Sequence, residues 1–440
     1  MSLVTPDKIR CLQRKLYTKA KREPTFRFYQ LYDKIYREDI LRHAWSLCRA
    51  NHGKPGVDGV TFEAIEASGL DEWLRQLWRD LHDKTYRPDP VRRVMIPKSG
   101  GGERPLGIPT IRDRVAQAAA KLVLEPIFEA DFEDSAFGYR PRRSAIDAVK
   151  EVHEGLCQGF TDVVDADLTG YFDSIPHGEL LAELERRVSD VHVIRLIRQW
   201  LKVPIEGRDE RGKRRLQGGQ GQSRGTPQGG VISPLLANVY MNRFLRAWRT
   251  EGKGDAFQAR IVNYADDFVI LSRGRAKEAL AWTRDVMTDL GLTLNERKTR
   301  LCQAQHEPFD FLGYTFGTLV YRKDGHTYLG AQPSKKAIAR VREHVRGILR
   351  SGVTAPWRHV RDRLNRTLRG WCGYFQHGTR TFAYRAVDNY VQSAVRDFLQ
   401  RRHKVPGRGI RRFPDSTIFG ELGVLRLRHE QLGRRVHASV

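Results

Sequence analysis

The sequence contains few cysteines, and none of them stands close to another. Five occur among the 440 residues, at Cys11, Cys48, Cys157, Cys302 and Cys372. A disulfide framework or a structural zinc site needs closely spaced groups of such ligands, so both are excluded as organising features. A reducing compartment such as the cytoplasm is therefore the expected location.

Long hydrophobic runs are also missing. A membrane-spanning helix needs about 18 to 20 consecutive apolar residues, whereas the apolar stretch 115–128 is interrupted by Lys121 and Glu125. The first residues lack the apolar core of a signal peptide, and Asp7 argues against a transit peptide. We therefore expect no membrane association.

Acidic residues are scarce relative to basic ones. The chain has 52 Asp and Glu against 77 Lys and Arg, which gives a net charge of +25 and a pI of about 10.1. Residues 331–440 alone carry 24 basic and 7 acidic residues. An excess this large favours a polyanionic partner, with nucleic acid ahead of an anionic membrane surface. The hydrophobic content of 40% is still sufficient for a folded core.

Local patterns predict a mixture of helices and strands. Ser144 with Asp147 predicts a helix start, as do Ser68 with Asp71 and Ser233 with Pro234. We expect helices at about 70–84, 112–130, 145–157, 178–188, 191–202, 233–249 and 275–290, and a basic helical region after Pro333. Hairpins are expected at 92–110 and 259–272, strands from 162 and at about 292–304 and 309–316, and a polar, glycine-rich segment at 205–230. This order predicts an α+β fold, an antiparallel sheet with helices on one face.

Two strand-like stretches carry paired aspartates. "VNYADDFVILS" at 262–272 places Asp266 and Asp267 at the bend of a hairpin, and "DADLTGYFD" places Asp165 and Asp167 on one face of a strand. Neighbouring carboxylates in an apolar setting need compensation, and Mg²⁺ is the simplest source. Two such ions can promote phosphoryl transfer when carboxylates from separate segments meet. The alternatives are a solvated acidic turn for 266–267 and an exposed edge or loop carboxylate, which we favour for Asp165.

Glycine-rich segments provide candidate phosphate and nucleotide contacts. Lys98 and Arg104 flank the glycine turn at 100–102, where a basic hairpin can hold a triphosphate, unless it is an ordinary solvated turn. The segment "RGTPQGG" at 224–230 combines glycines that permit close approach with Gln228, and it leads directly into a helix. A flexible linker is the alternative for this segment.

The C-terminal quarter combines basic helices with aromatic residues. Its cations recur at three- and four-residue spacings, which places several on common helical faces: Lys335, Lys336, Arg340, Arg342, Arg346, Arg350, Arg361, Arg363, Arg366 and Arg369. The aromatics are Trp371, Tyr374, Phe375, Phe382 and Tyr384. This pattern favours a phosphate backbone with stacking on unpaired bases. We expect most of the aromatics to belong to the helical core instead.

Nine ordered motifs resemble one family over residues 50–400. They are "GKPGVDGVTFEAI", "IPKSGGGERPLGIPTIRDRVAQAAAKLVLEPIFE", "FGYRPRRSAIDAV", "DADLTGYFDSIPH", "GTPQGGVISPLLANVYMN", "YADDFVIL", "LGLTLNERKTR", "FDFLGYTF" and "RGWCGYF". The chain resembles bacterial group II intron-encoded reverse transcriptases, or maturases. Because it lacks the paired cysteines of the H-N-H nuclease domain found in many relatives, it is most similar to the endonuclease-lacking, class C-like kind. We therefore expect no nicking of target DNA by the protein itself.

The resemblance implies roles for individual residues. Asp167, Asp266 and Asp267 correspond to the catalytic and metal-binding carboxylates, which leaves Asp165 out. Phe172 corresponds to the side chain that excludes a ribose 2′-hydroxyl. The remaining nucleotide contacts implied are Lys98, Arg104, Gln228 and Lys298. RNA contacts are expected at Lys335, Lys336, Arg340, Arg363, Arg366 and Arg369.

The resemblance also implies a right-hand polymerase and its substrates. Residues 1–160 correspond to an N-terminal extension and fingers, 161–320 to the palm, 321–400 to a helical thumb, and 401–440 to a possible remnant of a DNA-binding region. The expected activity is RNA-directed DNA synthesis from dNTPs with two Mg²⁺ ions, in the bacterial cytoplasm. Expected partners are a group II intron RNA, an RNA template with its DNA primer, and target DNA.

Two alternatives to this interpretation stay open. One is a related enzyme adapted to DNA repair, phage defence or CRISPR spacer acquisition. The other is an RNA-binding protein that acts only in splicing, although the presence of Asp167, Asp266 and Asp267 argues against a vestigial polymerase site.

Overall fold

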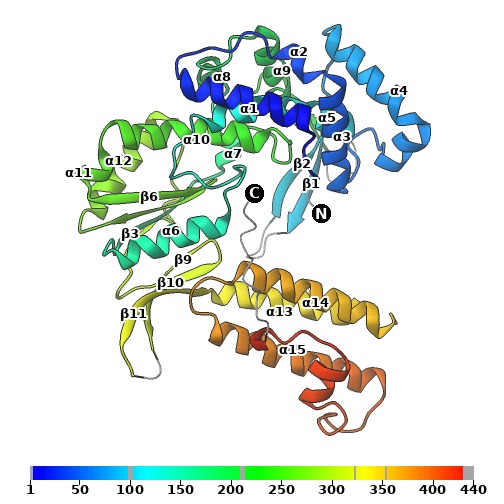
Figure 1. Cartoon of the computed structure of the whole chain (residues 1–440), viewed down its shortest axis with the longest axis vertical. Helices are drawn as coiled ribbons and strands as arrows, with labels where there is room; N and C mark the ends of the chain where they lie inside the picture. Colours follow the sequence, from blue (N-terminus) through cyan, green and yellow to red (C-terminus); the bar gives the residue numbers. More distant parts are fainter. Residues whose placement is uncertain (1–2, 98–102, 209–213, 322–323, 352–353, 430–440) are drawn as a thin grey trace.

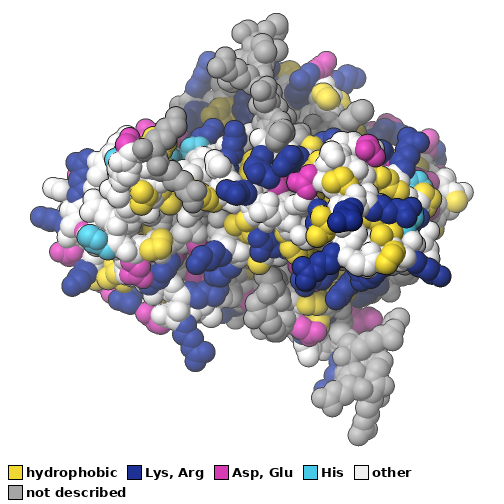
Figure 2. Space-filling model, turned by 90° about the horizontal axis from the view of Figure 1, so that it is seen from below, with side chains coloured by type: hydrophobic (Ala, Val, Ile, Leu, Met, Phe, Trp, Pro, Cys, Tyr) yellow, Lys and Arg dark blue, Asp and Glu magenta, His cyan; other side chains and the backbone are white. Residues whose placement is uncertain are grey.

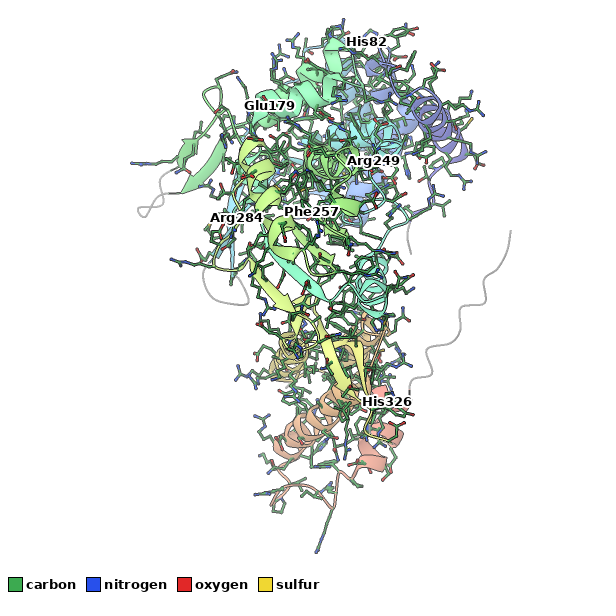
Figure 3. All side chains as sticks on the ribbon, turned by 90° about the vertical axis from the view of Figure 1, so that its left-hand side faces the viewer. His82, Glu179, Arg249, Phe257, Arg284 and His326 are labelled. Atoms are coloured by element: carbon green, nitrogen blue, oxygen red, sulfur yellow. The ribbon has the colours of Figure 1, made fainter. Side chains whose placement is uncertain are left out.

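The computed structural model describes residues 3–97, 103–208, 214–321, 324–351 and 354–429. The molecule is elongated, with His82 near one end and His326 toward the other (Figure 3). Helices gather at the top of Figure 1, a strand-rich region follows below them, and three long helices lie at the bottom. None of the described helices combines the length and the apolar character needed to cross a membrane.

The upper region is built around one buried helix, α5 (Ile111–Glu129), which the sequence predicts at 112–130. Most of its side chains are buried, as expected of a helix that is apolar on nearly every side. Helices α1 (Asp7–Arg22) and α3 (Glu38–Ala50) pack against it, with the short α2 (Tyr32–Ile35) between them in the chain. Thr110 caps α5 by accepting a hydrogen bond from the backbone N–H of Asp113 at 3.2 Å.

The helix predicted at 70–84 is present as the second part of a longer helix, α4 (Phe62–His82), whose first part was missed. The Thr61 hydroxyl caps the start of α4 by accepting from the Ala64 N–H at 3.2 Å. Gly69, with φ of 104°, interrupts the helix where the sequence indicated a start. The Ser68 hydroxyl donates to the carbonyl of Ile65 and caps nothing with Asp71.

A four-stranded sheet adjoins these helices. The predicted hairpin at 92–110 is present as antiparallel β1 (Val91–Pro97) and β2 (Glu103–Ile108). Strand β1 also pairs in parallel with β4 (Ile205–Arg208), which forms a hairpin with β5 (Arg214–Gln217). The sequence analysis expected only a polar, glycine-rich segment there, so these two strands were missed.

The central sheet has the order β6-β7-β3-β8, and its neighbouring strands are antiparallel as predicted. Its members are β3 (Asp162–Asp167), β6 (Ala259–Tyr264), β7 (Asp267–Ser272) and β8 (Arg300–Gln303). The predicted strand at 292–304 is therefore confined to its last residues. Residues 295–299 form turns instead, in which the N–H groups of Lys298 and Thr299 both bond the Asn295 carbonyl.

Helices cover both faces of this sheet, so the prediction of helices on one face is wrong. Alternate residues of β7 join different cores: Phe268 and Ile270 pack toward α10 (Ser233–Thr250) and α12 (Ala276–Asp289), while Val269 and Leu271 pack toward α6 (Ala145–Cys157). All three helices lie where the sequence predicts them. The expected capping box of Ser144 and Asp147 begins α6.

Short helices complete the middle of the chain. The predicted helices at 178–188 and 191–202 are α8 (His177–Glu185) and α9 (Val191–Leu201). Two single-turn helices, α7 (Tyr171–Ser174) and α11 (Lys253–Ala256), follow β3 and precede β6 respectively.

The last part of the chain begins with a three-stranded sheet of order β11-β10-β9. The single strand predicted at 309–316 is divided by a turn into two antiparallel strands, β9 (Phe309–Phe311) and β10 (Tyr314–Val320), and β11 (Thr327–Pro333) was missed. Three long helices follow, α13 (Lys335–Ser351), α14 (Trp357–Tyr374) and α15 (Thr381–Arg402), with two short turns of helix, η1 (Ser416–Glu421) and η2 (Leu427–His429). The basic helical region after Pro333 is thus confirmed.

Three hydrophobic cores are present among the described residues. The first joins α1–α5 to α10 and α12 and to one face of the central sheet. The second lies between α6, the other sheet face and β9–β11, and it includes Phe375. The third lies among α13, α14 and α15, and the partly buried Trp371 packs against both the second and the third core.

Candidate active site

The central sheet brings two predicted aspartates face to face. Asp167, the last residue of β3, is the cross-strand partner of Asp267, the first residue of β7, and Asp266 precedes it in the β6–β7 turn. The pKa of Asp267 is raised above its usual value, first by burial and then by the negative charges of Asp266 and Asp167. The site therefore concentrates negative charge that the protein alone does not fully compensate.

The turn that carries these aspartates is held in an unusual conformation. Ala265 has φ of 60°, in the left-handed region that costs a residue with a β-carbon free energy. Its carbonyl accepts a hydrogen bond from the buried Asn263 side chain at 2.9 Å. The backbone N–H of Asn263 in turn donates to the carbonyl of Ser135 at 2.8 Å. The neighbouring segment therefore supports the strained turn.

Because Gly138 has no side chain, the 135–138 segment can pack closely against the turn. A β-carbon at Gly138 would lie 2.4 Å from the backbone nitrogen of Ala265, which is too close for any other residue without displacement. The Gly138 carbonyl accepts a hydrogen bond from the side chain of Asn238 on α10 at 2.7 Å. Sequence reasoning missed Gly138, Asn238 and Asn263. Each stands in a stretch that the sequence singled out, Gly138 in "FGYRPRRSAIDAV", Asn238 in "GTPQGGVISPLLANVYMN" and Asn263 in "VNYADDFVILS", but none was assigned a role.

A lysine lies against the first carboxylate. The ammonium nitrogen of Lys298 is 2.8 Å from Oδ2 of Asp167, and the hydrogen bond raises the pKa of Lys298. The side-chain amide of Asn295 donates to the same oxygen at 3.2 Å, and its backbone N–H donates to the Asp167 carbonyl at 2.8 Å. The 293–299 segment thus orients Asp167 and brings a positive charge to it.

Asp165 departs from the expectation of an exposed edge or loop carboxylate. Strand β3 is internal to the sheet, and the Asp165 side chain is only 23% exposed. Burial raises its pKa, while Nε of Arg300 on β8 lies 3.1 Å from its Oδ2. Its charge is therefore matched by Arg300, which also lies 3.5 Å from the carboxylate of Glu307.

The donor set fits a magnesium-type cation. Carboxylate oxygens from two adjacent strands face each other, and Mg²⁺ prefers oxygen ligands of this kind. In the described parts of the chain, no three His, Cys, Asp or Glu side chains are gathered as a ready metal-binding group. The facing pair of Asp167 and Asp267 is thus the part of the predicted triad that the backbone brings together, with Asp266 adjacent in the turn.

The predicted nucleotide-contacting residues occupy neighbouring elements. Phe172 lies in α7, five residues after Asp167, and is 6% exposed, with its ring against those of Tyr139 and Tyr171. The side-chain amide of Gln228 donates to Oδ2 of Asp173 at 2.9 Å. Gln228 and Asp173 both line a cavity of about 280 Å³. The cavity lies between the loop that carries Gln228 and the sheet that contains β1, β2, β4 and β5. Asp173 was not singled out from the sequence.

The Gln228 loop is joined to the β1–β2 hairpin through the backbone. The N–H of Gly107 on β2 donates to the Gln228 carbonyl at 2.6 Å. Gly229 has φ of 114°, and a β-carbon there would lie 2.1 Å from the Gly107 carbonyl oxygen. Of the two predicted triphosphate contacts, Arg104 lies on β2 opposite Ile96, and Lys98 lies outside the described residues.

A large cleft opens beside the aspartates. Its volume is about 1180 Å³, and it is bounded by Asp165, Asp167 and Asp267 on one side and by α13 and α15 on the other. The cations along it are Arg297, Lys298, Arg300, Lys335 and Lys336. Phe382, which the sequence analysis expected with the helical core, is 42% exposed and lines this cleft.

The other predicted RNA contacts lie on exposed helical surface. Arg340 is on α13, and Arg363, Arg366 and Arg369 are on α14. Figure 2, which views the molecule from the end formed by these helices, shows Lys and Arg side chains spread across the face with hydrophobic side chains between them. Of the predicted aromatics, Phe375 and Tyr384 are buried in the cores as expected, whereas Trp371 and Tyr374 are partly exposed.

Comparison with known proteins identifies the family. Residues 96–316 match the family described as "Reverse transcriptase (RNA-dependent DNA polymerase)", and residues 338–413 match "Group II intron, maturase-specific domain". The chain belongs to the reverse transcriptases and carries the maturase-specific domain of group II intron proteins. The resemblance to group II intron-encoded reverse transcriptases and the enzyme class expected from the sequence are thereby confirmed.

Individual relatives agree with this assignment. Protein YkfC of Escherichia coli (strain K12) is 34% identical over 340 residues, which cover 69% of this chain and 87% of that protein. Group II intron-encoded protein LtrA of Lactococcus lactis subsp. cremoris is 29% identical over 352 residues, 65% of this chain and 56% of LtrA. The chain therefore spans most of YkfC and little more than half of LtrA. A telomerase structure from Candida albicans aligns with a TM-score of 0.43 at 13% identity, covering 81% of this chain and 71% of that one, a score too low to support a conclusion.

Proposed function

We propose that this reverse transcriptase adds deoxynucleotides to a DNA primer on an RNA template at the Asp167 and Asp267 pair, using two Mg²⁺ ions. The observation that carries the proposal is this pair. The two aspartates stand at the ends of two neighbouring inner strands, and they line a cleft of about 1180 Å³ that also contains several cations. A polyanionic duplex needs such a lining, and a pair of incompletely compensated carboxylates favours a divalent cation.

Each residue has a distinct role in this proposal. Asp167, Asp266 and Asp267 hold the ions, with the Asp266 side chain turning toward the facing pair. Held by these carboxylates, the ions would supply activation of the primer 3′-hydroxyl and charge stabilisation of the departing pyrophosphate. Lys298, whose ammonium group already lies at Asp167, supplies positive charge next to the reacting phosphate.

The nucleotide is held by groups around the aspartates. Gln228 contacts the incoming nucleotide, and the hydrogen bond to Asp173 orients the Gln228 side chain. Phe172 excludes a ribose 2′-hydroxyl by its bulk. Lys98 and Arg104 hold the triphosphate from the β1–β2 hairpin, which the loop of Gln228 anchors through Gly107.

The parts of a right hand are assigned as follows. Residues 1–160 form the N-terminal extension and fingers, 161–320 the palm, 321–400 the thumb, and 401–440 a basic segment related to a DNA-binding region. The central sheet with its aspartates lies within the proposed palm, and α13–α15 with their own core make up most of the proposed thumb.

The protein also binds a group II intron RNA, assists its splicing and takes part in its insertion into target DNA, in the bacterial cytoplasm. Support comes from the maturase-specific domain at 338–413 and from the exposed arginines of α14. Binding to the intron flanking the gene is expected to exceed binding to an unrelated structured RNA. Equal affinity for the two RNAs would contradict the maturase role.

Primer extension on an RNA template tests the polymerase. Asp266→Ala is expected to abolish extension at saturating template, because one of the ion-holding carboxylates is removed. Asp285→Ala, on the exposed surface of α12, is the matched control and should extend primers as the wild type does. Undiminished extension by Asp266→Ala would overturn the proposed mechanism.

A further inference from the structure

A second cavity lies between α13 and α14, where they meet the β9–β10 turn. Its volume is about 760 Å³, within the roughly 300–1,000 Å³ typical of small-ligand sites. Trp371, Tyr374 and Phe375 form its aromatic side, and Leu312, Ala337 and Val341 add aliphatic surface. This aromatic groove, as we call it, is separate from the nucleotide-contacting residues of the active site.

The aromatic side chains are held in place by the surrounding structure. The hydroxyl of Tyr374 donates to the carbonyl of Leu312 at 2.8 Å, and the Tyr374 carbonyl accepts from the hydroxyl of Tyr314 at 2.8 Å. The rings of Trp371 and Phe375 pack with their centroids 4.9 Å apart. A flat ligand would therefore meet a preformed surface and would not have to order it.

The rim of the aromatic groove is basic. Lys336, Arg340 and His344 follow one another at four-residue spacing along α13, and Arg366 faces them from α14. Among the residues that the structure describes, Asp310 is the one acidic side chain that lines it, and its carboxylate lies 3.9 Å from the Lys336 ammonium. Positive charge thus surrounds an aromatic surface, which is the combination that binds a base together with its phosphates.

The aromatic groove adjoins the active-site cleft. Asp310, Leu312 and Lys336 line both cavities, and Ala337 lies next to them in the groove. A strand that lies in the cleft therefore comes close to the groove.

We infer that the aromatic groove takes up one unpaired nucleobase of a bound RNA strand, with the flanking phosphates on Lys336, Arg340 and Arg366. The inference rests on the proposed function, in which this strand is template or intron RNA. A helical stem keeps its bases stacked and cannot insert one here. The groove therefore selects RNA with a bulged or unpaired nucleotide at this position.

Gly370 offers a way to close the groove without disturbing the fold. It lines the groove from α14, and a β-carbon there would meet no atom within 4 Å. Gly370→Leu therefore fills the groove, and it also favours the helix, since glycine is an unfavourable residue in a helix interior. Gly373→Leu is the matched control, because Gly373 is on the same helix, has the same open surroundings and is not among the groove-lining residues.

Four hairpins of one sequence serve as probes in equilibrium binding to the full chain. The first is RNA with a single bulged adenosine, the second is RNA with an abasic site at the bulge, and the third and fourth are the DNA forms of these two. The wild type and Gly373→Leu should bind the adenosine bulge about tenfold more tightly than the abasic one, as expected for stacking of one base. Gly370→Leu should bind the two equally.

Equal binding of the first two hairpins by the wild type, or retained discrimination in Gly370→Leu, would overturn the inference. If only the DNA hairpins differed in affinity between the adenosine and abasic forms, the choice of RNA would be overturned. A bulged 2-aminopurine gives a readout on the wild type alone, independent of how the variants fold. Its fluorescence should be quenched on binding, and unchanged fluorescence would contradict stacking.

Primer extension by the same wild-type preparation separates this inference from the proposed function. Extension without base discrimination would remove the aromatic groove's role and leave the polymerase intact. Base discrimination without extension would contradict the proposed polymerase activity and leave the groove's role in RNA binding.

Discussion

A divalent cation bound at Asp167, as proposed, would compete with Lys298 for the same carboxylate oxygen. The ammonium group lies 2.8 Å from Oδ2 of Asp167, and its side chain is 64% exposed. Exposed ion pairs contribute up to about 1 kcal/mol, so displacing this one costs a binding ion only a modest amount of free energy. The lysine therefore limits electrostatic repulsion in the ion-free site without blocking the ion.

Lys298→Gln is expected to tighten Mn²⁺ binding about threefold, because the competing charge is lost. The same variant should lower kcat, since positive charge next to the leaving group is also lost. Electron paramagnetic resonance of free Mn²⁺ measures the first effect and steady-state primer extension the second. Lys277→Gln, on the exposed surface of α12, is the control. Unchanged Mn²⁺ affinity in Lys298→Gln would show that the ion and the lysine do not compete.

Phe172 is proposed to select deoxynucleotides by its bulk. Phe172→Val is expected to raise the efficiency of ribonucleotide incorporation relative to deoxynucleotide incorporation by about tenfold or more. The ratio of the two kcat/KM values on one enzyme sample measures the effect. Because both values scale with the fraction of folded enzyme, any loss of stability cancels in the ratio. An unchanged ratio would remove Phe172 from the selection of the sugar.

At the scale of elements, the position of the β6–β7 turn depends on its contact with the 135–138 segment. Ala265 is held at φ of 60°, and Gly138 leaves the space that the turn occupies. Neither residue is expected to touch the substrate. The segment therefore positions the aspartates and takes no part in the chemistry.

Gly138→Ala is expected to lower kcat by at least about tenfold, because a displacement of about 1 Å at a reactive group can cost a hundredfold. The affinity for template and primer should change little, since the cleft lining is untouched. Gly178→Ala in α8, where a β-carbon meets no atom within 4 Å, is the matched control. Wild-type kcat in Gly138→Ala would mean that the turn does not need this close support.

The elements that the sequence predicts are those with local signals. Helix α6 has its capping box, and the 259–272 hairpin has an apolar run on each side of a two-residue turn. Strands β4 and β5 were missed because their sequences are polar, and β4 is held by pairing with the distant β1. The helix start at Phe62 was missed because Thr61 competes with Ser68 as a cap, and the structure decides between them.

The same distinction applies to the candidate site. Asp167, Asp266 and Asp267 belong to short motifs that are visible in the chain, and pairing of β3 with β7 brings two of them together. The contacts of Gly138 with Ala265 and of Asp173 with Gln228 join segments far apart in the chain. A local sequence pattern gives no information on contacts between distant segments, so these residues were found only in the structure.

At the scale of the whole molecule, the net charge of +25 is concentrated where nucleic acid is proposed to bind. Residues 331–440 include the exposed arginines of α14, and the active-site cleft has five cations along it. Binding should therefore release counterions and weaken steeply as salt increases.

Replacing three exposed arginines of α14 by glutamine is expected to reduce the slope of log Kd against log salt concentration by about 2, since each lost phosphate contact removes about 0.7–0.9. The variant combines changes at Arg363, Arg366 and Arg369. The control combines glutamines at Arg75, Arg79 and Arg284, which are exposed and ion-paired on α4 and α12. Fluorescence anisotropy at several salt concentrations gives the slopes, and equal slopes would contradict a role for α14 in phosphate binding.

The division into three cores has a mechanical consequence. Trp371 packs against both the core of α13–α15 and the core beneath the central sheet. Ala337 of α13 and Phe375 at the end of α14 are themselves buried in the core beneath the sheet. The three helices are therefore coupled to the sheet, and a load on the helices is carried to the strands that hold the aspartates.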